Sequence, residues 1–107
     1  MITSEAVLTE SIHLLSGVQG GGPACIDFIL RGDVVLVPSS TVSLQRCRKL
    51  LEKYSDLPMD FADSTLVVLA EDLNTDLVFT LDRDFQIYRI RGRKRFRILP
   101  KLTTRGL

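Results

Sequence analysis

The sequence predicts an α/β protein with a mainly parallel sheet. Short apolar runs rich in β-branched residues alternate with longer stretches of helical periodicity, in the order strand, helices, strand, helices, strand. The apolar run at residues 77–81 shows no alternation of polar and apolar side chains, which is typical of a parallel strand covered on both faces. The length of 107 residues fits a single domain, residues 1–107.

The first strand and helix are expected at the start of the chain. Residues 1–4 form the end of a strand that leads into a helix, and Thr3 or Ser4 can cap that helix. Gly17 then ends the helix. The glycine tract 20–22 has neither the GxGxxG spacing nor the Lys-Ser/Thr pair of a phosphate-binding loop, so we interpret it as a linker between helices.

A second helix is expected from Pro23 to near Gly32, because proline suits a first helical turn and glycine follows a last one. The β-branched run 34–37 predicts a strand. Ser39 or Ser40 can cap a third helix, whose apolar residues follow helical spacing.

The second half of the chain predicts a strongly apolar helix over residues 60–73. Its apolar side chains extend most of the way around the helix, which indicates burial against a sheet. The strand 77–81 follows. Two further short strands are expected at residues 85–90 and 96–99, joined by Gly92 and its basic neighbours.

The net charge of +1 hides an asymmetry along the chain. Residues 1–85 contain six basic and thirteen acidic side chains, a net charge of −7. Residues 86–107 contain eight basic and no acidic side chains, a net charge of +8. The chain is therefore an acidic body with a basic C-terminal segment.

Several classes of protein are not expected from the composition. Apolar runs such as residues 66–70 are far shorter than the roughly 20 residues of a membrane span, and no signal peptide is visible at the N-terminus. Cys25 and Cys47 are too few for a disulfide framework. A cytoplasmic protein with reduced thiols is expected.

A parallel sheet usually has its active site at the carboxyl ends of its strands. Several acidic side chains of this sequence are expected near those ends. These are Glu10 on the first helix, Asp60 and Asp63 in the first turn of the apolar helix, and Asp82 and Asp84 after the strand 77–81. Converging carboxylates repel one another unless a hard cation such as Mg²⁺ or Mn²⁺ lies between them. Such an ion can activate water and stabilise a phosphodiester under attack.

Each of these acids also has a purely structural interpretation. Asp60 and Asp63 have the spacing of a capping box, Asp82 and Asp84 suit a turn, and Glu10 suits a solvated helix face. A small regulatory α/β domain whose acids only cap helices and form turns is therefore an alternative. It would bind no divalent cation.

Taken together, the motifs resemble PIN-domain nucleases, and most closely the VapC-type toxins of prokaryotic toxin–antitoxin pairs. The likeness covers roughly residues 2–100 and rests on three separated motifs in the family's order. These motifs lie within residues 3–10, 54–85 and 88–100. The resemblance implies a three-layer α/β/α domain that cleaves RNA with Mg²⁺ or Mn²⁺, by metal-activated water attacking a phosphodiester.

The resemblance implies metal-binding and catalytic roles for Glu10, Asp63 and Asp82, with Asp84 as an accessory metal ligand. Thr80 would orient the cluster through hydrogen bonds. The remaining acid, at position 60, matches a subfamily residue and is expected outside the direct ligands.

The chain departs from the family at its N-terminus. Family members open with a strand that ends in an Asp and with the helix that follows it, whereas this sequence starts at the end of the family's second strand. We therefore expect an N-terminally truncated domain that lacks the first metal ligand and leaves neighbouring strands without a backbone partner. A start codon placed too late, a decaying copy, or a second chain that supplies the strand would each explain this.

The basic segment 86–107 is expected to contact RNA phosphates, through Arg91, Arg93, Lys94, Arg95 and Arg97. The four arginines alternate and could line one face of a strand. The alternative is that this segment is a solvated edge hairpin, whose Lys and Arg side chains only prevent aggregation.

The function predicted from the resemblance is a metal-dependent endoribonuclease of toxin–antitoxin type. RNA, a cognate antitoxin protein and a second copy of the chain are the implied partners. The alternative is a catalytically inactive truncated fragment that keeps antitoxin or self binding.

Overall fold

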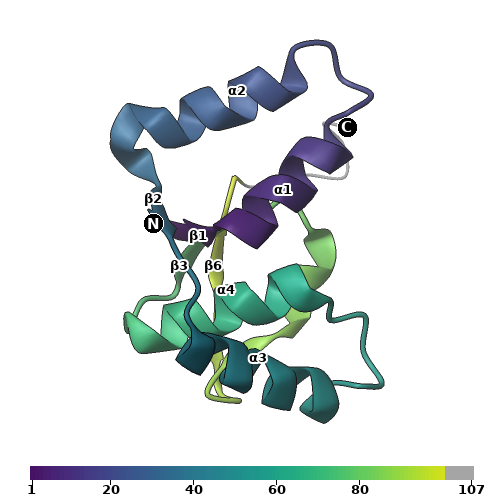
Figure 1. Cartoon of the computed structure of the whole chain (residues 1–107), viewed down its shortest axis with the longest axis vertical. Helices are drawn as coiled ribbons and strands as arrows, with labels where there is room; N and C mark the ends of the chain where they lie inside the picture. The colour runs from purple at the N-terminus through teal and green to yellow at the C-terminus, as the bar shows by residue number, and fades with distance from the viewer. Residues whose placement is uncertain (101–107) are drawn as a thin grey trace.

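A parallel sheet lies between two layers of helices (Figure 1). This computed structural model describes residues 1–100, so residues 101–107 of the predicted basic segment lie outside the described residues. The strands are β1 (Ile2–Ser4), β2 (Val35–Val37), β3 (Leu77–Phe79), β4 (Arg89–Ile90), β5 (Lys94–Arg95) and β6 (Arg97–Leu99). The helices are α1 (Glu5–Leu14), α2 (Gly21–Phe28), α3 (Thr41–Lys53) and α4 (Phe61–Asp72). The predicted α/β class with a parallel sheet is confirmed.

The sheet has the strand order β2-β1-β3-β6, and every neighbouring pair is parallel. Three residue pairs join β1 to β2 and three join β3 to β6, but only Ile2 and Val78 pair between β1 and β3. The absence of the family's first strand was expected to leave neighbouring strands without a backbone partner. That expectation is wrong, because β1 pairs directly with β3. The Thr3 hydroxyl strengthens this junction by donating to the Phe79 carbonyl at 3.0 Å.

Side-chain caps fix where three helices begin, as the sequence predicts. Ser4 accepts from the Val7 amide at the start of α1, and Ser40 forms a capping box with Ser43 at the start of α3. Asp60 and Asp63 form a second capping box at the start of α4. Each cap satisfies an amide that has no partner within its helix.

The core is divided by the sheet. The larger cluster centres on α4, whose Leu66, Val68 and Ala70 are fully buried, and it includes Phe85 and Tyr88. The smaller cluster lies between the sheet and the α1–α2 pair and contains the side chains of Cys25, Val34 and Phe79. Side chains on almost every side of α4 are buried, as its distribution of apolar residues predicts. This packing fixes the position of the N-terminus of α4.

Two local predictions are wrong. The predicted strand at residues 85–90 is instead a 3₁₀ helix, Arg83–Ile87, followed by the two-residue strand β4. Asp82 caps this 3₁₀ helix by accepting from the Asp84 amide at 2.9 Å, and this local hydrogen bond favours a helical turn over an extended strand. The glycine tract 20–22 is also more than a linker, because Gly20 adopts a φ of 73° as N-cap and α2 begins at Gly21.

Both cysteines of the described chain are free and buried. Between residues 1 and 100, no helix has the length and apolar character needed to cross a membrane.

Candidate metal centre

The N-terminus of α4 presents two carboxylates side by side. The Asp60 carboxylate accepts from the Asp63 amide at 2.9 Å, and the Asp63 carboxylate accepts from the Asp60 amide at 3.2 Å. Asp63 is only 1% exposed, whereas Asp60 lies at the surface. The reciprocal capping box therefore orients both carboxylates at one end of a buried helix.

Glu10 of α1 completes an acidic cluster with Asp60 and Asp63. One carboxylate oxygen of each residue lies within 4.8 Å of the others. Asp60, which was expected outside the direct ligands, thus lies within the same 4.8 Å group as Glu10 and Asp63. The packing of α1 beside α4 brings these residues together from distant parts of the sequence.

The proximity of the carboxylates raises the pKa of Glu10 to about 7. In its protonated form Glu10 donates a hydrogen bond to Asp60, and burial adds to the rise, as do the charges of Asp60 and Asp82. Burial chiefly raises the pKa of Asp63 to about 8, with further contributions from the charges of Asp60 and Asp82. Two members of the cluster thus retain protons where carboxyl groups are ordinarily ionised.

Asp60 behaves in the opposite way. Burial opposes its ionisation, but the hydrogen bonds that its carboxylate accepts from Glu10, Asp63 and the Ala62 amide hold its pKa below the usual value. Asp60 is therefore the ionised member that the two protonated carboxyls share as an acceptor.

Asp82 adjoins the acidic cluster without belonging to its tightest group. It follows β3, and its amide donates to the Thr80 hydroxyl at 3.1 Å. The charge of Asp82 raises the pKa of Asp63 and of Glu10, so Asp82 interacts with both members of the cluster. Thr80 thus contacts the backbone of Asp82.

Asp84 is placed differently. Its side chain is exposed, and its amide donates to Asp82. Within residues 1–100, the group of carboxylates close enough to share an ion consists of Glu10, Asp60 and Asp63.

Tyr88 is a neighbour of the cluster that the sequence motifs did not single out. Its buried hydroxyl donates to Asp63 over a long 3.5 Å contact. Burial raises the pKa of this phenol, as do the charges of Asp63, Asp82 and Asp60, so the hydroxyl stays protonated. A buried tyrosine needs a partner for its hydroxyl, and this need is the signal that could have linked it to the acids.

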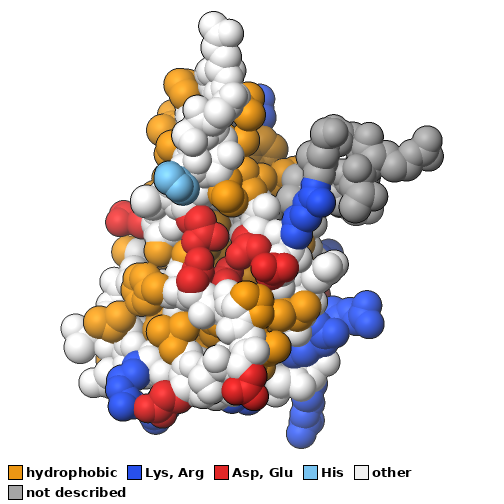
Figure 2. All heavy atoms as spheres, turned by 90° about the vertical axis from the view of Figure 1, so that its right-hand side faces the viewer, with side chains coloured by type: hydrophobic (Ala, Val, Ile, Leu, Met, Phe, Trp, Pro, Cys, Tyr) orange, Lys and Arg blue, Asp and Glu red, His pale blue; other side chains and the backbone are white. Residues whose placement is uncertain are grey.

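The ligand chemistry fits a hard divalent cation. The acidic cluster offers only carboxylate oxygens, the donors that Mg²⁺ and Mn²⁺ prefer. Figure 2 shows acidic side chains gathered on one face of the molecule, with basic side chains to one side of them.

The predicted RNA-binding residues are partly neutralised within the protein. Arg97 and Lys94 pair with Asp76 at 2.7 and 3.1 Å, and these contacts hold the pKa of Asp76 below its usual value. The guanidinium of Arg91 donates to the Glu71 carbonyl.

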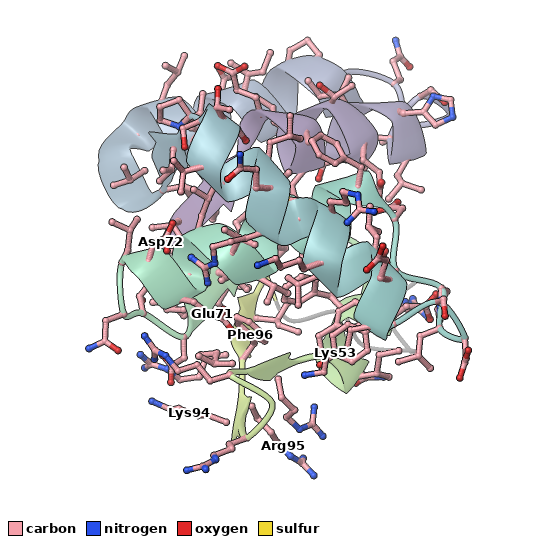
Figure 3. The ribbon with its side chains drawn as sticks, turned by 60° about the horizontal axis from the view of Figure 1, so that its bottom comes forward. Lys53, Glu71, Asp72, Lys94, Arg95 and Phe96 are labelled. Carbon is pink, nitrogen blue, oxygen red and sulfur yellow. The ribbon has the colours of Figure 1, made fainter. Side chains whose placement is uncertain are left out.

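The predicted arginine-lined strand face is wrong, because the alternating arginines do not share one strand. Arg91 has a φ of 50° and lies with Arg93 in the turn of the β4–β5 hairpin, while Arg95 and Arg97 belong to β5 and β6. At this hairpin, Lys94 and Arg95 extend away from the body of the protein (Figure 3).

The acidic cluster and the Asp76 ion pairs lie at opposite ends of β3. Asp76 precedes the strand and Asp82 follows it, and the six intervening steps of extended chain span at most about 20 Å. Lys94 and Arg97, which pair with Asp76, therefore lie at the opposite end of β3 from Asp82.

No protein-family model matches the chain, and a search of curated proteins finds none that matches it. The assignment of a function therefore rests on the carboxylate geometry and on the resemblance of the sequence motifs.

Proposed function

We propose that the protein is a metal-dependent ribonuclease of the toxin–antitoxin type, whose metal ion binds at the acidic cluster. The observation that carries the proposal is the convergence of Glu10, Asp60 and Asp63, with their ligand oxygens within 4.8 Å of one another. The choice of RNA as substrate, and of an antitoxin and a second copy as partners, rests on the resemblance to VapC-type toxins.

Glu10, Asp60 and Asp63 would hold the cation, and Asp82 would add negative charge beside it. A bound Mg²⁺ or Mn²⁺ would supply activation of water and stabilisation of the negative charge on a phosphodiester. Glu10 and Asp63 must release their protons before they can act as ligands, so their raised pKa values make cation binding pH-dependent.

Neighbouring groups keep these carboxylates in place. The capping box fixes Asp60 and Asp63 relative to the axis of α4, and Thr80 holds the backbone of Asp82. The Tyr88 hydroxyl contacts Asp63 from the buried side. These contacts hold Asp60, Asp63 and the backbone of Asp82 without a ligand, and such preorganisation favours electrostatic catalysis.

The test is cleavage of a labelled RNA by the purified chain with Mg²⁺ or Mn²⁺, compared with the variants Asp63→Asn and Asp82→Asn. Asparagine keeps the size and hydrogen-bond acceptor of each side chain while removing the charge. We expect activity to fall about a hundredfold or more in Asp63→Asn, because one lost electrostatic contact at a reacting centre commonly costs that much. Equal activity in all three proteins would refute the site.

A second candidate, a partner-binding protein without hydrolysis, is favoured by an apolar groove along α3. The groove has a volume of about 660 Å³ and includes Leu44, Leu51 and Phe61 among its lining residues. Leu44 and Phe61 are 51% and 45% exposed, so the groove presents apolar surface to solvent. Absence of metal-dependent cleavage, with a dimer seen by sedimentation that Leu44→Glu dissociates, would favour this candidate.

A further inference from the structure

The β4–β5 hairpin places two unpaired arginines face to face. Arg89 lies directly opposite Arg95 in the antiparallel register. Throughout residues 1–100, neither guanidinium forms an ion pair, whereas Arg97 and Lys94 on the same segment are bound to Asp76. Like charges directly opposite each other destabilise a strand pair. This arrangement becomes favourable when an anion binds between them.

Both arginines line one cavity, which we call the arginine pocket. Its volume is about 550 Å³, within the range typical of small-molecule sites. The lining residues are Gln86, Ile87, Arg89, Arg95, Phe96 and Ile98. The pocket thus combines a cationic side, one amide side chain and an apolar wall.

The cationic and apolar sides of the pocket are held differently. Arg89 is anchored, because its guanidinium donates to the carbonyls of Gln86 and Tyr88 at 2.9 Å. Arg95 is exposed and free to meet a ligand. Phe96 packs against Phe85 with ring centroids 4.9 Å apart, which fixes the apolar wall; Figure 3 shows it lying inward of the outward-pointing Arg95.

From this arrangement we infer that the arginine pocket binds one nucleotide of single-stranded RNA, with the phosphate between Arg89 and Arg95 and the base against Ile87 and Phe96. Guanidinium groups bind phosphate through paired N–H donors. Single-strand binding sites commonly combine such cations with apolar or aromatic surfaces for the base. The Gln86 amide supplies a donor and an acceptor for a base edge.

This inference rests on the proposed ribonuclease function. The position of the arginine pocket relates it to the acidic cluster. Asp82 caps the beginning of the 3₁₀ helix Arg83–Ile87, and Arg89 donates to a carbonyl near its end. Five residues of 3₁₀ helix span about 10 Å. A strand held in the pocket would therefore extend toward the acidic cluster within a few nucleotides, and the pocket would position the substrate without touching its reacting phosphate.

The test measures binding without cleavage. The full chain is titrated against a fluorescent uridine hexamer in EDTA, and the anisotropy gives the dissociation constant. We expect Arg95→Gln to weaken binding roughly tenfold, as loss of a charge-assisted phosphate contact does. The matched control is Arg31→Gln, which removes one exposed positive charge outside the pocket and outside the basic segment, and should weaken binding less than about twofold. Equal weakening by both variants would overturn the inference.

Two further arms test the base and the kind of partner. We expect the uridine hexamer to bind several-fold more tightly than an abasic ribose-phosphate chain of the same length, and Ile87→Ala to reduce that difference. Equal affinity for both chains would refute the base contact. Displacement of the RNA by an aspartate hexapeptide at equal concentration would instead assign the pocket to an acidic protein partner.

Failure of this inference can be told apart from failure of the proposed function. Binding in EDTA depends on the arginine pocket, whereas cleavage depends on the acidic cluster. Asp63→Asn is expected to keep uridine-hexamer affinity within about twofold while losing cleavage, because a distant carboxylate contributes little to phosphate binding.

Discussion

The carboxylate of Asp60 caps α4 and also lies within 4.8 Å of ligand oxygens of Glu10 and Asp63. These two roles demand different chemistry. A cap needs only an oxygen that accepts from the Asp63 amide, whereas a cation ligand needs negative charge. Substitutions at this position can therefore separate helix capping from metal binding.

We predict that Asp60→Ala lowers the free energy of unfolding by about 1 kcal/mol, because the N-cap is lost. Asp60→Ser should stay within about 0.5 kcal/mol of the wild type, because serine caps equally well. Both variants should lose most of the stabilisation by Mn²⁺. Urea unfolding with and without Mn²⁺ measures both effects, and an undiminished Mn²⁺ effect in Asp60→Ser would exclude Asp60 as a ligand.

At the residue scale, the sequence predicted the caps well because capping is local. Ser4, Ser40 and Asp60 each accept from an amide three residues away, so spacing alone reveals them. The approach of Glu10 to Asp60 depends on how α1 packs against α4. No local pattern encodes that packing, and the sequence therefore did not reveal that Asp60 joins the acidic cluster.

At the scale of elements, Glu71 connects three parts of the fold. Its carboxylate pairs with Arg46 of α3 at 2.7 Å and accepts from the Arg91 amide of the hairpin turn at 2.6 Å. Figure 3 shows Glu71 and Asp72 at the end of α4, above the hairpin. The helix that positions the acidic cluster at one end thus holds the basic hairpin at the other.

Loss of the Glu71 contacts should destabilise the β4–β5 hairpin more than the hydrophobic core. We predict that Glu71→Ala destabilises the protein by about 1–2 kcal/mol, because it leaves the Arg91 amide without its partner and removes one of the two acidic partners of Arg46. Hydrogen exchange should accelerate at residues 91–95 more than at the fully buried residues of α4. Asp72→Ala, which removes an exposed partner of the same arginine, is the control and should leave exchange in the hairpin nearly unchanged.

The prediction of helices and strands succeeded for α4, where apolar periodicity reflects burial. It failed at residues 85–90, where a local cap determines the backbone conformation. The apolar residues of α4 surround the helix, and its predicted span matches the structure closely. Residues 85–90 were predicted as a strand, but Asp82 initiates a 3₁₀ helix at Arg83. Arg91 and Gly92 adopt positive φ angles in the hairpin turn. The turn interrupts the strand, so the alternating arginines do not lie on one strand face as predicted.

At the scale of the whole molecule, the near-neutral net charge conceals a separation of charge in space. The acidic cluster lies beyond the carboxyl end of β3, and Asp76 with its basic partners lies before its amino end. Lys94 and Arg97 are largely neutralised there by Asp76. The positive charge left for a polyanion is therefore that of Arg89 and Arg95, which line the arginine pocket.

The acidic cluster also makes global stability depend on pH. Folding raises the pKa of Glu10 to about 7 and that of Asp63 to about 8, whereas the unfolded chain releases these protons near pH 4. The folded state therefore binds more protons between these limits, and the free energy of unfolding must fall as the pH rises from about 4.5 to 8. A divalent cation would offset this fall, because it stabilises the ionised carboxylates.

The most direct test is the free energy of unfolding between pH 5 and 8, measured with and without Mn²⁺ for the wild type and Asp63→Asn. We predict that wild-type stability falls with pH in EDTA and is restored by Mn²⁺, by about 2.7 kcal/mol when the ion is at a hundred times its dissociation constant. Asp63→Asn should show a shallower pH dependence and little response to Mn²⁺. Wild-type curves that are identical with Mn²⁺ and with EDTA would contradict a metal centre at the acidic cluster.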